Sequence, residues 1–263
     1  TEALELRAAG IGAPVLAWLY RPDEPLDDLV RAGVDLSVSS DGALRQVLAA
    51  ARATGRTARV HVKVDTGLGR GGVPPAELPA LLDAAVAAQA TGAVDVVGIW
   101  SHLAWADAPD HPTVHAQAAV FRDAVALAEK AGAHLEVRHL ANSAATLTNP
   151  AMGFDLVRPG LAVFGLTPVP QLGGPERFGL VPAMRLEAEL VLAKRVPAGH
   201  GVSYGHEYVT DRETVLGVVP LGYADGVPRH ASGTHGRPGA PVQVGGRRLG
   251  IAGRVCMDQF VVD

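Results

Sequence analysis

The segment Lys63-Val-Asp-Thr-Gly-Leu-Gly-Arg70 places a lysine at the end of an apolar, β-branched run and an arginine in the turn that follows. If the Lys63 side chain points into a core, burial lowers the pKa of its ammonium group and makes the amine a candidate Schiff-base nucleophile. The same neutral amine can react with carbon dioxide, and the resulting carbamate anion would orient Arg70. A solvated lysine on the outside of the strand is the alternative that needs no chemistry.

Two further segments place polar side chains directly after apolar runs. His102 follows one such run, where a histidine is more often a hydrogen-bonded structural group than an acid or a base. In His139-Leu-Ala-Asn-Ser-Ala-Ala145, small residues and the Ser143 hydroxyl lie between a predicted strand and a predicted helix. Backbone N–H groups and Ser143 can therefore approach a phosphate there. Plain helix capping by Asn142 or Ser143 is the alternative.

The segment Val157-Arg-Pro-Gly-Leu161 favours the phosphate interpretation. Gly160 allows a ligand to approach the backbone closely, and Arg158 supplies a fixed cation beside it. In a (β/α) barrel, the last two units commonly form the site for phosphate-bearing ligands.

Two tyrosines and one cysteine lie in turns of the C-terminal third. Tyr204 occurs in Gly-Val-Ser-Tyr-Gly and Tyr223 in Gly-Tyr-Ala-Asp-Gly, where tyrosines are commonly lids over apolar surface. The segment Cys256-Met-Asp-Gln259 offers weak support for nucleophilic catalysis, because no histidine is paired with the cysteine. The histidines and carboxylates show no metal-ligand spacing, so no metal site is predicted.

Strand-like runs alternate with helical patterns through the first part of the chain. Apolar, β-branched runs occupy residues 15–20, 34–38, 58–64, 94–100, 135–140 and 161–165. Apolar residues at helical spacing predict helices over 43–52, 77–90 and 115–131, each followed by a glycine suited to a C-cap, namely Gly55, Gly92 and Gly132. This alternation predicts a parallel α/β sheet. Polar residues after successive strands favour a (β/α)8 TIM-type barrel, whose active site lies at the carboxyl ends of its strands.

The pattern of apolar residues changes beyond about residue 180. Short runs at 184–192, 214–219, 241–244, 248–251 and 260–262 are separated by Gly- and Pro-rich turns, which is typical of a mainly antiparallel β domain. We therefore predict a cofactor-binding barrel over residues 1–180 and a β domain over 181–263, joined by a linker within 168–182.

Neither predicted domain is complete. Six predicted strands are two fewer than a closed barrel needs, so at roughly 30 residues per βα unit we expect the first units to lie before Thr1 and to be missing from this chain. The last run of the β domain stops at Asp263, and we expect that domain to be truncated as well.

Composition narrows the classes of partner. Of 263 residues, 48% are hydrophobic and 19% charged, and the net charge of −4 comes without a basic run, so neither nucleic acid nor an anionic membrane is an expected partner. The apolar stretches are too short to span a bilayer, and the residues after Thr1 have the wrong polarity for a signal peptide. The single cysteine, Cys256, fits a reducing compartment. These features predict a cytoplasmic protein.

Seven segments together resemble the alanine racemase family: KVDTGLGR, SHLA, HLANSAA, VRPGLAVFG, GVSYG, LGYADG and GRVCMDQ. They occur in the family's order and cover essentially the whole chain. The resemblance implies a pyridoxal 5'-phosphate enzyme, a homodimer with shared active sites, that interconverts L- and D-alanine and supplies D-alanine for peptidoglycan.

The resemblance also implies roles for individual residues around the cofactor. Ser143 and the backbone at Gly160 and Leu161 would hold the phosphate, and Arg158 would face the pyridine nitrogen. Because a guanidinium keeps its proton, that nitrogen would stay unprotonated and the cofactor would be a poorer electron sink. His102 and Asn142 would support Arg158.

Further roles concern the substrate and the bases. Lys63 matches the family's carbamylated lysine, which positions Arg70 near the substrate carboxylate, and the Met257 amide would also bind that carboxylate. Tyr204 would act across a head-to-tail dimer interface as the base for the L-enantiomer, acting on the external aldimine, with Tyr223 as a supporting residue. A lysine, also the Schiff-base residue, would serve the other face.

One departure from the family is serious. The Lys-Ala-x-x-Tyr-Gly-His-Gly type of segment that carries the Schiff-base lysine does not occur in this sequence, and Lys130 and Lys194 lie in helical and β patterns that make them poor substitutes. Three alternatives stay open: a racemase of another or broader amino acid range, a non-catalytic pyridoxal phosphate-binding homologue, and a lyase-type barrel that uses Lys63 as its nucleophile. A decarboxylase fits less well, because the Gly-Gly-Gly phosphate loop of that group is missing.

Overall fold

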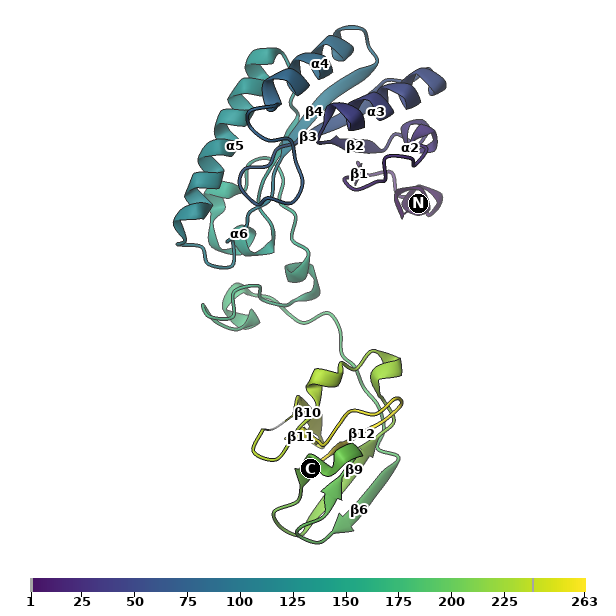
Figure 1. The fold of residues 1–263 in the computed structure, drawn as a ribbon, viewed down its shortest axis with the longest axis vertical. Helices are drawn as coiled ribbons and strands as arrows, with labels where there is room; N and C mark the ends of the chain where they lie inside the picture. Colours follow the sequence, from purple (N-terminus) through teal and green to yellow (C-terminus); the bar gives the residue numbers. More distant parts are fainter. Residues whose placement is uncertain (1, 238) are drawn as a thin grey trace. The chain divides into compact units, whose positions relative to one another are not determined.

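The computed structural model describes residues 2–237 and 239–263, and they form two compact units, Thr1–Met184 and Arg185–Asp263 (Figure 1). Each unit has its own sheet and its own hydrophobic core. Among the described residues, no helix is both long enough and apolar enough to cross a membrane.

The first unit is built on a five-stranded parallel sheet. Its strands are ordered as in the sequence: β1 (Leu16–Ala17), β2 (Asp35–Val38), β3 (Ala58–Lys63), β4 (Val94–Trp100) and β5 (Val137–His139). Crossovers between parallel strands usually contain helices, and here they contain α2 (Asp27–Arg31), α3 (Asp41–Thr54), α4 (Leu78–Ala90) and α5 (Pro112–Ala131). Helix α1 (Glu2–Ala8) precedes the sheet and α6 (Ser143–Thr148) follows it.

The caps that the sequence suggests define the ends of the helices. The Ser40 hydroxyl accepts a hydrogen bond from the Ala43 amide at the start of α3, and Gly55 ends that helix in the left-handed conformation. Pro112 occupies the first turn of α5, and Gly132 ends it with a φ of 97°. Helices α3, α4 and α5 lie side by side along the sheet (Figure 1). The predicted parallel α/β sheet is therefore confirmed, as half of a barrel.

The predicted sixth strand over residues 161–165 is wrong. Leu161–Phe164 form a 3-10 helix, η2, because Pro159 has no N–H for a strand ladder, Gly160 turns the chain and Gly165 ends the segment in the left-handed conformation. Beyond β5 the sheet continues through a single parallel bridge between Asn142 and Arg158. The sixth position in the sheet thus lies three residues before the predicted run.

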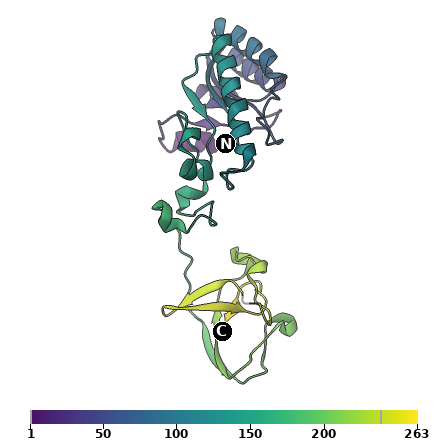
Figure 2. The same ribbon diagram turned by 90° about the vertical axis from the view of Figure 1, so that its left-hand side faces the viewer.

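The second unit is antiparallel. Its main sheet has the order β10-β11-β12-β9-β6, with bounds Pro241–Val244, Arg247–Ala252, Phe260–Val262, Thr214–Val219 and Leu192–Val196. Strands β7 (Gly201–Val202) and β8 (Tyr208–Val209) form a separate ribbon. The two-residue turn Gly245-Gly246, with both φ angles positive, joins β10 to β11 as such hairpins require. These strands are the green and yellow arrows of Figure 1 and Figure 2, and the predicted antiparallel β domain is confirmed.

One predicted strand of this domain is displaced. Residues 184–191 have no regular structure, and β6 begins only at Leu192. The partner strand β9 explains this, because it ends at Val219 and pairs with β6 from Leu192↔Val218 to Val196↔Thr214. Val191 still donates to the Val218 carbonyl at 3.0 Å, but residues 184–190 lie beyond the end of the strand with which they would pair.

Short 3-10 helices complete both units: η1 (Pro150–Met152) and η3 (Pro175–Phe178) in the first, and η4 (Tyr204–His206), η5 (Tyr223–Asp225) and η6 (Arg229–Ala231) in the second.

Candidate active site

The carboxyl ends of the parallel strands bring the candidate residues of the first unit to one edge of the sheet. Lys63 ends β3, His102 follows β4, and Ser143 follows β5. Arg158 joins them because its backbone pairs with Asn142, and its amide donates to the Ala141 carbonyl at 3.0 Å. Gly160 and Leu161 follow two and three residues later. Seven residues that the sequence singled out thus belong to this edge.

Arg158 is at the centre of this edge and is largely buried. Its Nη1 donates to Nδ1 of His139 at 2.9 Å, and its Nη2 donates to the carbonyl oxygens of Ser101 and Leu140 at 2.7 and 3.3 Å. Nδ1 of His102 lies 3.5 Å from the same Nη2. Burial lowers the pKa of Arg158 to about 10, so the guanidinium remains a cation at neutral pH.

Behind Arg158 is a chain of buried polar groups that sequence reasoning missed. Nε2 of His139 lies 3.0 Å from Nδ1 of His61, and Nε2 of His61 lies 3.2 Å from Oδ2 of Asp35. A β-bulge in β4 opposite His61 and the bare Gly98 make room for the ring, because a Cβ on Gly98 would lie 2.1 Å from Nδ1 of His61. A polar residue inside an otherwise apolar strand, as at Asp35 and His61, is the signal that could have revealed the chain.

The Trp100 ring lies close to both cationic side chains, Lys63 and Arg158. Its ring is stacked with Trp18 and with His139, at centroid distances of 5.4 and 5.5 Å. Nζ of Lys63 lies 4.4 Å and Cζ of Arg158 4.9 Å from the Trp100 ring, distances at which cations are attracted to an indole face. No pattern in the sequence singles out Trp100.

Lys63 is half-buried and lies among cations. Burial, then the charges of Arg70 and Arg158, lower the pKa of its ammonium group, and Asp65 opposes them. A lowered pKa increases the fraction of neutral amine, which is the form that reacts with carbon dioxide. The inward orientation that the sequence left open is the one observed.

The turn that carries Arg70 is held by its own backbone. Oδ1 of Asp65 accepts hydrogen bonds from the amides of Gly67, Leu68 and Gly69 at 3.0–3.1 Å. Gly72 returns the chain to Lys63 at a φ of 128°, where a Cβ would lie 2.5 Å from the Asp65 amide nitrogen. Arg70 itself is exposed at the tip of this turn.

Gln117 of α5 ties this turn to the His102 segment. Its Nε2 donates to the Thr66 hydroxyl and to the His102 carbonyl, both at 3.1 Å, and its Oε1 accepts from the Ala104 amide. Burial, then the charges of Arg158, Arg70 and Lys63, lower the pKa of His102 to about 4. His102 is therefore a neutral imidazole at pH 7.

Ser143 and the turn at Gly160 form the part of the edge suited to an anion. The Ser143 hydroxyl accepts from the Ala162 amide at 3.3 Å, and a Cβ on Gly160 would meet nothing within 4 Å. The Asn142 side chain caps α6 by accepting from the Ala145 amide, so it adjoins Arg158 only through the backbone bridge.

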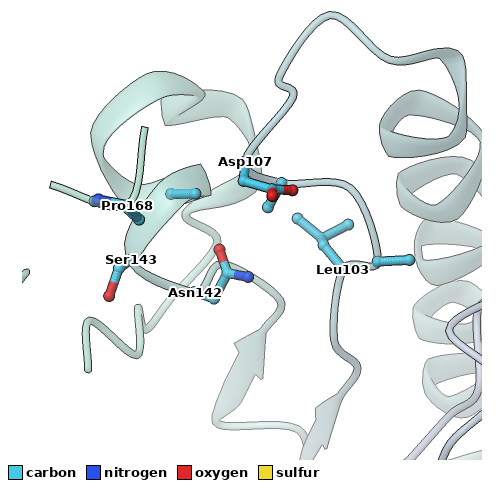
Figure 3. A pocket seen from close by; sticks show the side chains of 8 residues that line it. Leu103, Asp107, Asn142, Ser143 and Pro168 are labelled. Atoms are coloured by element: carbon cyan, nitrogen blue, oxygen red, sulfur yellow. The ribbon is translucent and has the colours of Figure 1, made fainter. Parts of the chain in front are cut away.

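A pocket of about 200 Å³ opens beside Ser143 (Figure 3). Leu103 and Asp107 lie on one side of it and Asn142, Ser143 and Pro168 on the other.

The three candidates of the second unit lie on three loops that contact one another. The Ser203 hydroxyl donates to the Arg254 carbonyl at 2.7 Å and lies 3.3 Å from Sγ of Cys256, so the residues before Tyr204 and Met257 touch. The Tyr223 amide donates to the Cys256 carbonyl at 2.9 Å. The Tyr204, Met257 and Tyr223 side chains are 69%, 59% and 42% exposed, and therefore accessible to a ligand.

Comparison with known proteins covers both units. The sequence model described as "Alanine racemase, N-terminal domain" matches residues 1–168, and that of the C-terminal domain matches residues 183–263. Proteins named alanine racemase from Frankia casuarinae and Mycobacterium bovis are 60% and 50% identical over 262 residues, which is all of this chain and 67% and 66% of theirs.

Solved structures show the same likeness. The alanine racemase of the D-cycloserine producer Streptomyces lavendulae is 58% identical, with a TM-score of 0.94 over 100% of this chain and 67% of its own. That of Streptomyces coelicolor A3(2) is 53% identical, also with a TM-score of 0.94 and with 68% of its chain covered.

Proposed function

The chain belongs to the alanine racemase family and has that family's racemase activity, and we propose how its residues divide the work of interconverting L- and D-alanine. The observation that carries the proposal is the edge of the first sheet. There a buried arginine, a serine hydroxyl and an open glycine turn occur together, next to a lysine of lowered pKa.

Pyridoxal 5'-phosphate fits this edge. Ser143, Gly160, Leu161 and the Ala162 amide would hold the phosphate, because a hydroxyl, backbone N–H groups and the lack of a side chain at Gly160 suit an anion that must come close to the backbone. When bound, this cofactor withdraws electrons from the α-carbon of an amino acid and so makes its α-proton removable.

We assign Arg158 to the ring nitrogen of that cofactor. Its guanidinium is held by four acceptors of the protein and keeps its protons at neutral pH, so it presents donors only. A group that cannot give up a proton leaves the ring nitrogen unprotonated. This restricts electron withdrawal to what proton removal needs and disfavours side reactions. His102, neutral and 3.5 Å away, supports this arrangement.

We assign Arg70 and the Met257 amide to the substrate carboxylate. A guanidinium matches a carboxylate with two parallel donors. Lys63, as a carbamate, would place a negative charge between two arginines and hold Arg70 in position; its half-buried place and lowered pKa support this. Tyr223, on a loop that contacts Met257, supports this part of the site.

We assign Tyr204 as the base that moves the α-proton of L-alanine. Racemisation needs a base on each face of the planar carbanion, and we assign none of Lys63, Lys130 and Lys194 to the other face. Lys63 is turned toward Trp100, and the other two lie in α5 and β6.

We propose a head-to-tail homodimer in which Tyr204 of one protomer serves the site of its partner. Exposed apolar side chains in the first unit support an interface, since Val163, Phe164, Val181 and Met184 are 52–80% exposed. We also propose that the half-barrel described above belongs to a closed eight-stranded barrel. The enzyme works in the cytoplasm and supplies D-alanine for peptidoglycan. The substrate is a small amino acid; no nucleic acid or membrane takes part.

The test is exchange of the α-proton into deuterated water, followed separately from L- and D-alanine by NMR. In the holoenzyme, Tyr204→Phe should slow exchange from L-alanine by about 10²–10⁴-fold, the usual contribution of a general base, while leaving cofactor binding intact. The matched control is Tyr208→Phe in the same unit, whose hydroxyl donates to Asp263 at 2.7 Å. Undiminished exchange from L-alanine in Tyr204→Phe would refute the assignment.

A further inference from the structure

Four side chains form one continuous hydrogen-bonded chain across the sheet of the first unit. It runs from Nη1 of Arg158 to Nδ1 of His139 (2.9 Å), from Nε2 of His139 to Nδ1 of His61 (3.0 Å), and from Nε2 of His61 to Oδ2 of Asp35 (3.2 Å). His139, His61 and Asp35 are 1%, 5% and 6% exposed, so solvent does not take part.

The two ends determine the direction of every bond in this chain. An arginine only donates, so Nδ1 of His139 accepts and the ring proton of His139 lies on Nε2. That proton is donated to Nδ1 of His61, whose own proton then lies on Nε2 and is donated to the Asp35 carboxylate, which only accepts. Both rings are neutral and carry their protons on Nε2. Burial, then the charge of Arg158, lower the pKa of His139 to about 2, which agrees with a neutral ring.

Asp35 is held in place by a second partner, Arg59. Nε of Arg59 donates to its Oδ1 at 3.0 Å, and the other two guanidinium nitrogens bind Glu136 at 3.0 and 2.9 Å. Burial raises the pKa of Asp35, but hydrogen bonds from His61 and Arg59 outweigh burial and hold it below its ordinary value. The carboxylate therefore stays an acceptor through the neutral range, with one oxygen for Arg59 and the other for His61.

We propose that Asp35 and His61 are positioning residues that fix the His139 tautomer and thereby hold the Arg158 guanidinium in the orientation used at the active site. The consequence for the cofactor ring rests on the proposed function, whereas the direction of the hydrogen bonds does not. The charge of Asp35 acts two rings away from Arg158, so the guanidinium is oriented without being neutralised by a carboxylate in direct contact.

The substitution Asp35→Asn tests this because it keeps the shape and reverses the chain. Arg59 needs an acceptor, so the new amide turns its oxygen to Arg59 and its NH₂ to His61. His61 must then carry its proton on Nδ1 and donate to His139, and His139 must carry its proton on Nδ1, where it opposes the Arg158 donor. A donor facing a donor releases Arg158 from His139.

The first measurement is the pair of ring ¹⁵N resonances of His61 and His139, which distinguish the two neutral tautomers. We expect Nε2–H for both in the unaltered protein and Nδ1–H at His61 in Asp35→Asn. We also expect kcat/KM of the Asp35→Asn holoenzyme to fall by about 10–100-fold, the effect of losing one hydrogen bond to a charged group.

The matched control is Asp95→Asn, whose carboxylate binds Nδ1 of the exposed His134 at 3.1 Å. It should alter neither the tautomers of His61 and His139 nor the kinetics. An Nδ1–H tautomer or a charged ring at His139 in the unaltered protein overturns the proposal, even if Asp35→Asn does not fold. Reversed tautomers with unchanged kcat/KM overturn the positioning role alone, and neither result bears on the Tyr204 exchange test.

Discussion

The hydrogen-bond acceptors of the Arg158 guanidinium, within the part of the chain that the structure describes, are imidazole nitrogens and carbonyl oxygens, without a carboxylate. The side chain is therefore oriented while its charge stays available. Its neighbours adapt to that charge, because burial and Arg158 keep His102 and His139 neutral. At the scale of single residues, the site is a cation held by neutral dipoles.

This arrangement predicts how stability depends on pH. The pKa of His139 is about 2 in the fold and 6.5 as a free side chain, so the unfolded chain binds the extra proton first. The contribution of neutral His139 to the free energy of unfolding is fully present above pH 6.5. It is lost as the pH falls toward 2, by up to about 1.4 kcal/mol per pH unit. His139→Gln should therefore flatten the fall in the free energy of unfolding between about pH 7 and pH 5, measured by urea titration.

His134→Gln is the control for that experiment, because His134 is exposed and its partner is Asp95. It should leave the pH dependence unchanged. If His139→Gln and the unaltered protein lose stability in parallel on acidification, His139 is not held neutral by the fold.

The sequence predicts the residues at the carboxyl edge of the sheet better than the buried residues that support them. Lys63, His102 and Ser143 could be placed at one edge because each lies at or after the end of a predicted strand, and parallel strands present their carboxyl ends together. Arg158 precedes the predicted run at 161–165 and joins this edge because its backbone pairs with Asn142. His61 could not be placed, because its partners come from strands that are distant in the sequence. Only strand register, including the bulge in β4, brings its ring between His139 and Asp35.

At the scale of elements, the functional side chains of the second unit depend on glycines that let loops pass close together. Gly253 has a φ of 76°, and a Cβ there would lie 2.6 Å from the Val202 carbonyl oxygen and 2.9 Å from Cβ of Ser203. Ser203, with a φ of 60°, adopts a conformation that few side chains tolerate, and its hydroxyl bond to the Arg254 carbonyl holds it there. The loop that carries Tyr204 is thus held by the close approach of Gly253 to Val202 and by the hydrogen bond from Ser203 to Arg254.

The substitution Gly253→Ala tests whether this close approach holds the Tyr204 loop. It adds left-handed strain and a steric clash, so we expect it to lower the free energy of unfolding by about 2–4 kcal/mol and to slow α-proton exchange from L-alanine. Gly245→Ala, at a φ of 53° with nothing within 4 Å, adds the strain alone and should cost about 1–2 kcal/mol. Denaturant unfolding of both variants measures the difference, and equal losses would show that the contact at Gly253 is unimportant.

Elements were predictable where local chemistry determines them. The helices end at Gly55 and Gly132 because left-handed caps are encoded locally. The run at 161–165 has the composition of a strand, yet Pro159 and Gly160 direct the chain into a 3-10 helix. Residues 184–190 alternate as a strand would, but the short partner strand β9 ends before reaching them. The residues just before the run decide the first case and the length of the partner strand decides the second, and the composition of the runs themselves shows neither.

At the scale of the whole molecule, the candidate residues are divided between two units with separate cores. Arg158, Ser143 and Lys63 belong to the first, and Tyr204 and Met257 to the second. A head-to-tail dimer would pair the first unit of one protomer with the second unit of its partner, so that each active site is completed across the interface. Whether the two sets act within one chain or between chains is therefore a question about assembly.

Mixing two inactive holoenzymes answers it. Tyr204→Phe removes a functional group of the second unit, and Arg158→Ala removes one of the first unit. If each site is formed between chains, a mixed dimer therefore has one intact site and one doubly altered site. Statistical re-association should then restore about a quarter of the unaltered racemase activity, since half of the dimers are mixed and half of their sites are intact. Sites formed within a single chain would give no recovery, because every chain would carry one defect. The control mixes Tyr204→Phe with the double variant Tyr204→Phe/Arg158→Ala, which offers no intact second unit and should stay inactive in either case.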